Sequence, residues 1–273
     1  MKPGRLLERV RAVRPVVHHL TNFVTANDVA NVTLATGAVP VMAHAAEEVA
    51  EVVDQASCVV LNLGTPTPSR LQVMREAGRR ANARGVPVVM DPVGVGLSRF
   101  RAEAVAGILQ EVRTSAVRAN LAEMAHLAGA EGLLRGVESA GAGAAPEDAA
   151  RRVARRYRLV AAVTGPQDWV TDGARLVRVD NGHPLLQRIT GGGCMATAVV
   201  ACFMAVAEDL LEASVAALAY FGYAAELAAA QATGGGSFRA LLLDQLAQMR
   251  PEDLEQGARV REVSSPATGG SGD

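Results

Sequence analysis

The chain has 273 residues, a formal net charge of −1 at pH 7, and 49% hydrophobic residues, few of them aromatic. This length fits one large domain or two small ones, with a sizeable core of Ala, Val and Leu. The sequence has neither the basic stripe of a nucleic-acid surface nor the ~20 uninterrupted apolar residues that span a membrane. The irregular spacing of Cys58, Cys194 and Cys202 argues against a disulfide framework and favours a reducing, cytoplasmic setting.

The first two thirds of the chain are predicted to alternate between strands and helices. The N-terminal segment is predicted to be an amphipathic helix, since it lacks the apolar run and cleavage site of a signal peptide. Four continuous apolar runs, typical of strands buried on both faces, lie at residues 58–63, 86–90, 116–119 and 159–163. Helical patterns lie at about residues 69–84, 102–113, 121–128 and 147–156. This alternation predicts an α/β fold with a mostly parallel sheet covered by helices.

The last third of the chain departs from that alternation. Asp172-Gly173 separates two short apolar runs and predicts an antiparallel hairpin at the sheet edge. Three alanine-rich helices are expected at about residues 195–208, 214–231 and 238–248, with Ser237 as the N-cap of the last one. We expect residues 136–146 to form a loop within the domain and residues 264–273 to be a disordered tail. The prediction is therefore a single domain over residues 1–263.

Ligands of open parallel sheets bind at the carboxyl ends of the strands, so the polar residues there are the candidates for chemistry. Thr190-Gly-Gly-Gly-Cys194 stands directly before a predicted helix. Glycines admit close approach to the backbone, and the free N–H groups of a helix N-terminus favour a phosphate or a developing oxyanion. Cys194 would then lie in the first helical turn, where the pKa of a thiol tends to fall. The alternative interpretation is a flexible junction with a buried cysteine.

Two further strand ends carry carboxylates. Asp91 closes an apolar run and precedes Pro92; it is explained either by turn geometry or by a Mg²⁺ or phosphate-linked water. Asn120 and Glu123 have the spacing of a capping box. The functional alternative places Arg118 on phosphates and Glu123 near a metal.

The remaining polar and sulfur-containing residues carry weaker signals. His18 and His19 are adjacent, so their rings point in different directions, and we interpret them and His44 as structural or surface residues rather than metal ligands. Met42 follows an apolar run and is expected to belong to the core. Thr164 followed by Gly165 is, taken alone, a turn at a strand end.

Together these segments resemble the hydroxyethylthiazole kinase family of the ribokinase-like superfamily, from about residue 7 to residue 259. Each motif is short, and the specificity lies in their order and spacing. The motifs are His18-His-Leu-Thr-Asn22, Thr36-Gly-Ala-Val-Pro-Val-Met42, Leu61-Asn-Leu-Gly-Thr65, Met90-Asp-Pro-Val-Gly94, Val117-Arg-Ala-Asn120 with Glu123, Val163-Thr-Gly165, Asn181-Gly182 and Thr190-Gly-Gly-Gly-Cys194.

The resemblance implies a ribokinase-like enzyme that transfers the γ-phosphoryl group of ATP to the primary alcohol of 4-methyl-5-(2-hydroxyethyl)thiazole, for thiamine biosynthesis or salvage. It implies a requirement for Mg²⁺ and a homotrimer with the thiazole site at the subunit interface. The partner is then a small heterocyclic alcohol, with no nucleic acid and no membrane involved.

The resemblance also implies roles for individual residues. Cys194 takes the position where the wider superfamily usually has a catalytic Asp. Because phosphoryl transfer depends mostly on positioning and charge stabilisation, a thiol can stand there without abolishing turnover. The other implied roles are thiazole binding by Asn22 and Met42, contact with the substrate alcohol near Gly191, ATP contacts by Arg118 and Thr164, and a place near the phosphates and Mg²⁺ for Asp91 and Glu123.

Three residues depart from the family pattern. Phe23 replaces a common polar residue beside the expected thiazole pocket, which bears on substrate preference. Ala119 replaces a common Gly, which is a small change. Pro166 stands where a Glu is usual, which bears on the nucleotide contacts.

Three rival functions share this fold. A kinase for a pyrimidine alcohol or a sugar keeps the chemistry, although the apolar stretch Val39-Pro-Val-Met42 disfavours a sugar, which needs many hydrogen-bonding groups. An ATP-dependent lyase that repairs hydrated nicotinamide cofactors generally carries Asp at the position of Cys194. A non-catalytic nucleotide or thiazole sensor is disfavoured by the presence of Asp91, Arg118, Glu123 and Cys194 together.

Overall fold

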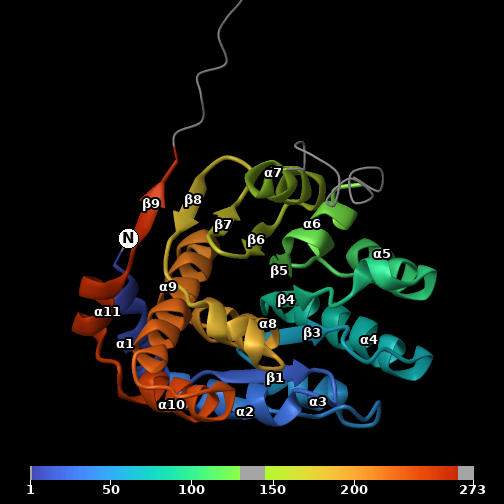
Figure 1. Ribbon diagram of the computed structural model, residues 1–273. Coiled ribbons are helices and arrows are strands. Elements are labelled where there is room, and N and C mark those ends of the chain that lie inside the picture. The colour runs from blue at the N-terminus through green and yellow to red at the C-terminus, as the bar shows by residue number, and fades with distance from the viewer. Residues whose placement is uncertain (1, 130–144, 264–273) are drawn as a thin grey trace, which may run out of the picture.

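The computed structural model describes residues 2–129 and 145–263. Within these residues nine strands form one sheet, in the order β2-β1-β3-β4-β5-β6-β7-β8-β9 (Figure 1). The strands are β1 (Val16–Leu20), β2 (Val39–Val41), β3 (Cys58–Asn62), β4 (Val88–Asp91), β5 (Ala116–Asn120), β6 (Val160–Thr164), β7 (Asp168–Thr171), β8 (Leu176–Val179) and β9 (Val260–Glu262).

The strand directions agree with the sequence prediction. Strands β1 to β6 pair in parallel, whereas β7, β8 and β9 pair antiparallel at one edge. The predicted hairpin is confirmed: the carboxylate of Asp172 accepts hydrogen bonds from the backbone N–H groups of Ala174 and Arg175, and Gly173 has a φ of 93°. All the parallel strands present their carboxyl ends at the same edge of the sheet, which is where open parallel sheets bind their ligands.

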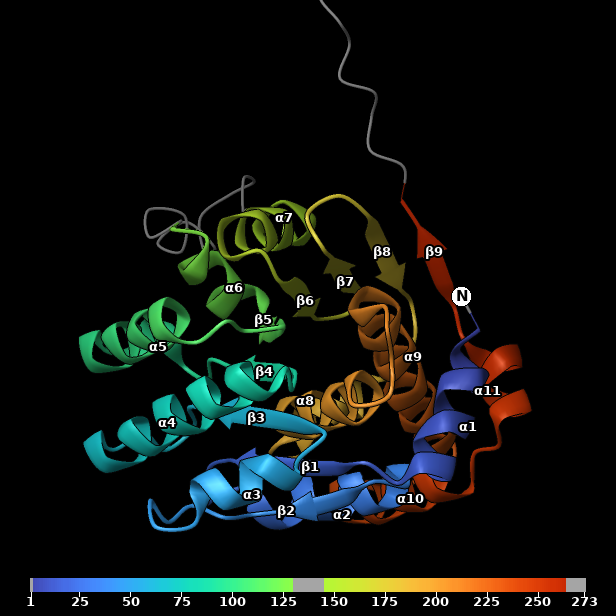
Figure 2. The ribbon, with the colours of Figure 1, turned by 180° about the vertical axis from the view of Figure 1, so that it is seen from behind.

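Helices cover both faces of the sheet (Figures 1 and 2). One apolar cluster packs helices α1, α2, α8, α9, α10 and α11 against one face of the sheet. A second apolar cluster packs helices α3, α4, α5, α6 and α7 against the other face. Valines of a single strand alternate between the two clusters, as the pleat of a strand requires: Val60 belongs to the first and Val59 to the second. The helices are α1 (Pro3–Val13), α2 (Ala26–Thr36), α3 (Val49–Gln55), α4 (Pro68–Arg84), α5 (Arg99–Glu111), α6 (Leu121–Leu127), α7 (Pro146–Tyr157), α8 (Gly192–Met204), α9 (Leu210–Ala229), α10 (Gly235–Gln248) and α11 (Pro251–Gly257), with short 3₁₀ turns η1 (Val95–Leu97) and η3 (Pro184–Arg188).

Helix α9 is long and apolar enough to cross a membrane by length and composition, but 72% of its apolar window is buried inside the fold. It packs between α8 and α10 and against β6, β7 and β8. Its apolar character therefore comes from its place in the core.

The two ends of the described chain lie side by side. Helix α1 packs against α11 and α9, and the backbone N–H of Gly4 donates to the side chain of Glu255 over 2.9 Å. Arg11 donates to the carbonyl of Met249 over 2.7 Å. Figure 2 shows α1 beside α11, away from the carboxyl ends of the parallel strands.

Some expectations about element boundaries were wrong. Helix α8 begins at Gly192 rather than at residue 195, because the glycines adopt helical turns instead of forming a loop. Helix α10 begins after Gly234, so Ser237 is not its N-cap; its hydroxyl instead accepts hydrogen bonds from the N–H groups of Thr233 and Gly234. Most of the expected loop at residues 136–146, and all of the expected tail at residues 264–273, lie outside the described residues.

Candidate active site

The buried carboxylate of Asp91 is the centre of a polar cluster at the carboxyl ends of β3, β4 and β5. Asp91 is fully buried. Its Oδ2 accepts hydrogen bonds from Asn62 Nδ2 and from Thr197 Oγ1, each over 2.9 Å. Arg118 Nη1 lies 3.6 Å from its Oδ1. The compensation that a buried carboxylate requires therefore comes from two neighbouring strands and from helix α8.

Asn62 links this carboxylate to the cysteine. Its Oδ1 accepts from the backbone N–H of Gly64 and from Asn22 Nδ2. Since a backbone N–H can only donate, the Asn62 amide nitrogen must face the other way, toward Asp91 and toward Cys194 Sγ, 3.2 Å away. Asn22 Nδ2 lies 3.5 Å from the same sulfur. Asn22, Asp91, Arg118 and Cys194, which the sequence places far apart, therefore meet in one network.

Burial dominates the electrostatics of Asp91. The pKa of Asp91 is raised to about 6, because burial outweighs the opposing effects of the Arg118 charge and of the hydrogen bonds from Thr197 and Asn62; the Glu123 charge adds to the rise. Asp91 Oδ1 is buried and has no hydrogen-bond partner among the described residues. An acceptor in this position can take a further donor or a cation.

The expectation of a lowered thiol pKa at Cys194 was wrong. Burial, and then the charge of Asp91, raise the pKa of the Cys194 thiol, although hydrogen bonds involving Thr25 and Asn62 and the Arg118 charge oppose them. Cys194 does lie in the first turn of α8, as predicted. The helix N-terminus is outweighed because desolvation disfavours the thiolate more than the helix dipole favours it.

The glycines before Cys194 are required by two close approaches. Gly191 has a φ of 85°, and a Cβ there would lie 2.6 Å from Thr25 Cγ2. A Cβ on Gly193 would lie 2.5 Å from Arg118 Nη1. The guanidinium of Arg118 therefore packs directly on the backbone at the opening of α8, where the unpaired N–H groups of the first turn attract anions.

A cavity of about 530 Å³ adjoins this helix N-terminus. Arg118 and Thr164 both line it, and Arg118 Nε and Nη2 donate to Thr164 Oγ1 over 3.1 and 2.6 Å. Its volume is within the range of small-molecule sites. The lining residues are Arg118, Asn120, Thr164, Gly165, Pro166, Asp168, Asn181, Gly182, His183, Pro184, Leu186, Gln187, Gly192, Gly193, Ala196, Leu218, Phe221 and Gly222.

Glu123 forms the capping box that its spacing from Asn120 predicts. Its Oε2 accepts from the N–H of Asn120, and the Asn120 side chain accepts from the N–H of Glu123. Its Oε1 accepts from the N–H of Gly94 over 2.8 Å, which ties the loop after β4 to α6.

Among residues 2–129 and 145–263, no group of three or more His, Cys, Asp or Glu side chains is placed to hold a metal. A divalent cation here would need phosphate oxygens or water to complete its coordination.

The adjacent histidines of β1 lie in the core. His18 and His19 are fully buried; Nε2 of His18 lies 2.8 Å from the carbonyl of Ala43, and that of His19 lies 3.1 Å from Thr33 Oγ1. Met42 directly follows β2 and packs, half-buried, against the core cluster of α2 and α8. The structure thus places Met42 near the end of β1 but does not join it to the Asp91 network.

Phe23 lies at the surface, with 71% of the residue exposed. The Arg70 guanidinium lies 4.3 Å from the Phe23 ring centroid, and the His44 ring lies 6.4 Å from it. Phe23 therefore extends the surface beside Asn22 without entering the polar network.

Sequence reasoning missed three residues of the site: Asn62, Thr197 and Asp168. Asn62 closes an apolar strand as Asp91 does, so the strand-end criterion could have found it. Asp168 precedes an apolar run at the start of β7, a position that this criterion does not cover. Thr197 lies within an alanine-rich helix and gives no signal of its own.

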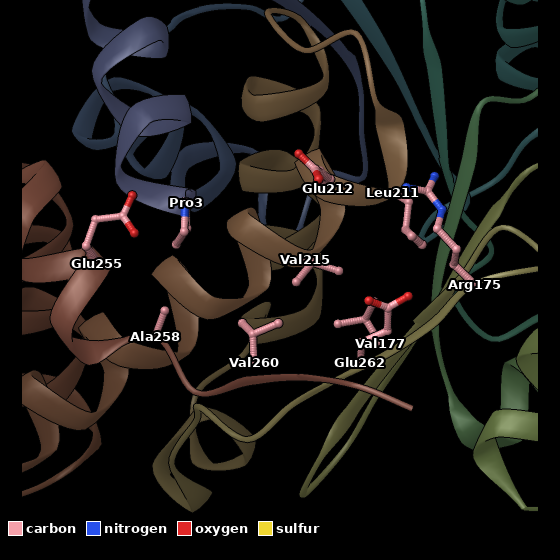
Figure 3. A pocket seen from close by; sticks show the side chains of 10 residues that line it. All are labelled: Pro3, Arg175, Val177, Leu211, Glu212, Val215, Glu255, Ala258, Val260 and Glu262. Atoms are coloured by element: carbon pink, nitrogen blue, oxygen red, sulfur yellow. The ribbon is translucent and has the colours of Figure 1, made fainter. Parts of the chain in front are cut away.

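A second cavity, of about 370 Å³, is lined by residues of α9, α11 and β9 (Figure 3). Val215 and Val260 give it an apolar part, and Arg175, which also lines it, is paired with Asp172 and Asp209. None of the residues of the Asp91 network lines it. The cavity beside α8 is therefore the one that the candidate chemistry adjoins.

Comparisons with known proteins show which family this chain belongs to. A hydroxyethylthiazole kinase of Desulforudis audaxviator (strain MP104C) is 51% identical over 260 residues, which cover 95% of each chain. The structure of a hydroxyethylthiazole kinase protein from Pyrococcus horikoshii OT3 superposes with a TM-score of 0.88 at 40% identity, over 96% of this chain and 99% of that one. A ribokinase-like superfamily protein from Enterococcus faecalis V583, with a TM-score of 0.62 at 13% identity over 90% of this chain and 95% of its own, shares the fold. Residues 7–252 match the hydroxyethylthiazole kinase family, and the chain therefore belongs to that family.

Proposed function

We propose that this protein uses ATP to phosphorylate the primary hydroxyl of 4-methyl-5-(2-hydroxyethyl)thiazole, in thiamine biosynthesis or salvage. Family membership supports the reaction. The observation that carries the proposal for this chain is the meeting of Asp91, Arg118 and Cys194 at the N-terminus of α8, beside a cavity of about 530 Å³. A phosphoryl group needs positive charge and backbone N–H donors, and this site offers both.

In this proposal the nucleotide occupies the cavity with its phosphates toward α8. Arg118 and Thr164 contact the phosphates, since both line the cavity and are hydrogen-bonded to each other. The N–H groups of the first turn of α8 bind the transferring phosphoryl group. Because Arg118 rests on Gly193, its charge is held next to these donors.

The alcohol lies on the other side of the α8 N-terminus. Asn22 and Met42 contact the thiazole, and the hydroxyl approaches Gly191 and Cys194. With its pKa raised by burial, Cys194 is a neutral thiol near pH 7. We infer that Cys194 positions the attacking hydroxyl and that its contribution as a base is small, which suits a reaction that depends on positioning.

We further propose that Mg²⁺ binds near Asp91 and Glu123. The buried Oδ1 of Asp91, which has the Arg118 charge 3.6 Å away but accepts no hydrogen bond among the described residues, fits a hard cation or its bound water. Two carboxylates suit Mg²⁺, which usually keeps several waters and takes further ligands from substrate phosphates. When bound, the ion would neutralise charge on the β- and γ-phosphates.

We also propose a homotrimer in a reducing cytoplasm, with the thiazole site at the subunit interface. Phe23, Val24 and Leu34 are exposed by 71%, 66% and 55%, close in sequence to Asn22, and an interface would cover them. The free state of all three cysteines fits a reducing compartment.

Light scattering tests the oligomeric state and is expected to give the mass of a trimer for the wild-type protein. Phe23→Lys should reduce this mass, and Leu97→Lys, at another exposed hydrophobic residue, should leave it unchanged. A monomeric wild-type protein would contradict this arrangement.

An ATP-consumption assay over a panel of heterocyclic alcohols tests the reaction. We expect hydroxyethylthiazole to be phosphorylated far above the other alcohols. A preference for a pyrimidine alcohol would favour the related kinase activity, to which exposed Phe23 would contribute. Equal ATP consumption without any alcohol would favour the nicotinamide-repair lyase.

A further inference from the structure

Asp168 is a carboxylate in the cavity beside α8 that the phosphoryl-transfer roles leave unused. It begins β7 and is half-buried, and its Oδ1 accepts a hydrogen bond from the backbone N–H of Gly165 over 3.0 Å. Among the described residues, no hydrogen bond to its Oδ2 and no ion pair is found. Burial raises its pKa to about 7, against the Gly165 hydrogen bond and the Arg118 charge. A carboxylate so placed is stabilised by a ligand that donates hydrogen bonds.

The register of the sheet places Asp168 between two different ends of the cavity. Val163 pairs with Trp169, so Asp168 lies opposite Thr164, about one strand spacing of 4.8 Å away. On its other side Asp168 pairs with Val179 of β8. The cavity wall therefore runs from Thr164 through Asp168 to the segment that follows β8.

These two ends differ in chemistry. The Thr164 end carries the Arg118 guanidinium and the N-terminal turn of α8, which suit phosphates. The segment that follows β8 contributes Pro184 to the lining, and α9 contributes Leu218 and Phe221; these apolar side chains suit the face of a base. The part of a nucleotide between its phosphates and its base is the sugar.

We propose that Asp168 accepts hydrogen bonds from the ribose hydroxyls of the nucleotide, so that the enzyme selects ribonucleotides over their deoxy counterparts. This inference rests on the proposed function, since it requires the nucleotide to occupy this cavity. A phosphate near the Asp168 carboxylate would be repelled, whereas two vicinal hydroxyls can donate to one carboxylate. Asp168 thus determines specificity at a point away from the transferred group.

Calorimetric titration of the full chain with ADP, 2′,3′-dideoxy-ADP and inosine diphosphate, in EDTA and without alcohol, tests the proposal. Wild type is expected to bind ADP about tenfold or more tightly than the dideoxy nucleotide, as for loss of a hydrogen bond to a charged group. Asp168→Ala should weaken ADP binding and bring the ratio below about threefold. In Asp168→Asn the Gly165 N–H keeps the amide oxygen, so the amide nitrogen faces the sugar, and selectivity should fall as well.

Two further variants separate the possible failures. Asp244→Ala, at an exposed carboxylate of α10 outside the cavity, should bind every nucleotide as wild type does. Thr164→Ala should weaken ADP and dideoxy-ADP alike. If Asp168→Ala weakens both equally, or alters only the preference for ADP over inosine diphosphate, the assignment to ribose is overturned. If neither Thr164→Ala nor Asp168→Ala affects any nucleotide, the nucleotide does not occupy this cavity, and its proposed placement fails as well.

Discussion

The amide of Asn62 donates a hydrogen bond to the buried carboxylate of Asp91 over 2.9 Å. The same amide nitrogen lies 3.2 Å from Cys194 Sγ. Asn62 therefore couples the Asp91 carboxylate, which we propose faces the metal, to the Cys194 thiol, which we propose faces the alcohol. A substitution at one of these two residues should therefore affect the other.

Replacing Asn62 by Ala should slow the alkylation of Cys194. The Asn62 hydrogen bond lowers the pKa of this thiol, so its loss should leave less thiolate at any given pH. Cys58 and Cys202 are fully buried, so iodoacetamide labelling, followed by mass spectrometry from pH 6 to 10, reports on Cys194. Asn82→Ala, at a surface asparagine bonded to Arg113, is the matched control. A profile identical to wild type would show that Asn62 has no influence on the sulfur.

Replacing Cys194 by Ala should leave measurable kinase activity, and replacing it by Asp should retain or raise kcat. Burial keeps the thiol neutral, so the loss on Cys194→Ala should not exceed the ~10²–10⁴-fold typical of a general base. Cys202→Ala, on the same helix and away from the network, serves as the control for steady-state kinetics. Complete inactivity of a folded Cys194→Asp protein would count against the placement of Cys194 beside the attacking hydroxyl.

The pH dependence of stability should differ between wild type and Asp91→Asn. The pKa of Asp91 is raised by burial from 3.8 to about 6, so the stability it contributes is full below pH 4 and is lost as pH rises through 6. The raised pKa corresponds to about 3 kcal/mol. The free energy of unfolding of wild type minus that of Asp91→Asn should fall by up to that amount between pH 4 and 8. Urea unfolding at intermediate pH values measures it, and a constant difference would contradict a raised pKa.

Replacing Gly193 by Ala should raise the KM for ATP by about tenfold, as expected when a hydrogen bond to a charged group is lost. The new Cβ would lie 2.5 Å from Arg118 Nη1 and would displace the guanidinium. Gly236 occupies the same position in the first turn of α10, where a Cβ would meet nothing within 4 Å. Gly236→Ala should therefore keep the wild-type KM. Equal values for the two variants would argue that Arg118 does not bind the nucleotide.

The fold could be predicted from the sequence wherever hydrophobic pattern decides the structure. The apolar runs at β3 to β6 and the Asp172-Gly173 turn gave the parallel sheet and its antiparallel edge. The short strands β1, β2 and β9 were not predicted, because β1 contains two buried histidines and β2 contains Pro40, which do not follow an apolar pattern. The start of α8 was placed too late because glycine has low helix propensity, while tertiary contact with Arg118 favours it there.

The site was predictable only in part. Strand-end position singled out Asp91 and Arg118, whereas Thr164 was selected only through the family resemblance; the structure brings all three together with Cys194. The pKa of Cys194 was predicted in the wrong direction, because sequence shows the helix N-terminus but not the desolvation by its neighbours. Thr197 acts through a contact with Asp91 on a distant strand, which no local pattern reveals, and Asp168 stands at the start of a strand, where the strand-end criterion does not apply.

The pairing of α1 with α11 has a consequence for how the chain is made. Helix α1 is synthesised long before α9 and α11, the two helices against which it packs. Its buried residues Leu7 and Val10 therefore lack their final cover until α11 has been made, and the cost of closing so long a loop delays docking. Nascent chains that end before α11 should bind hydrophobic-peptide chaperones through this helix, and chains that include α11 should release them.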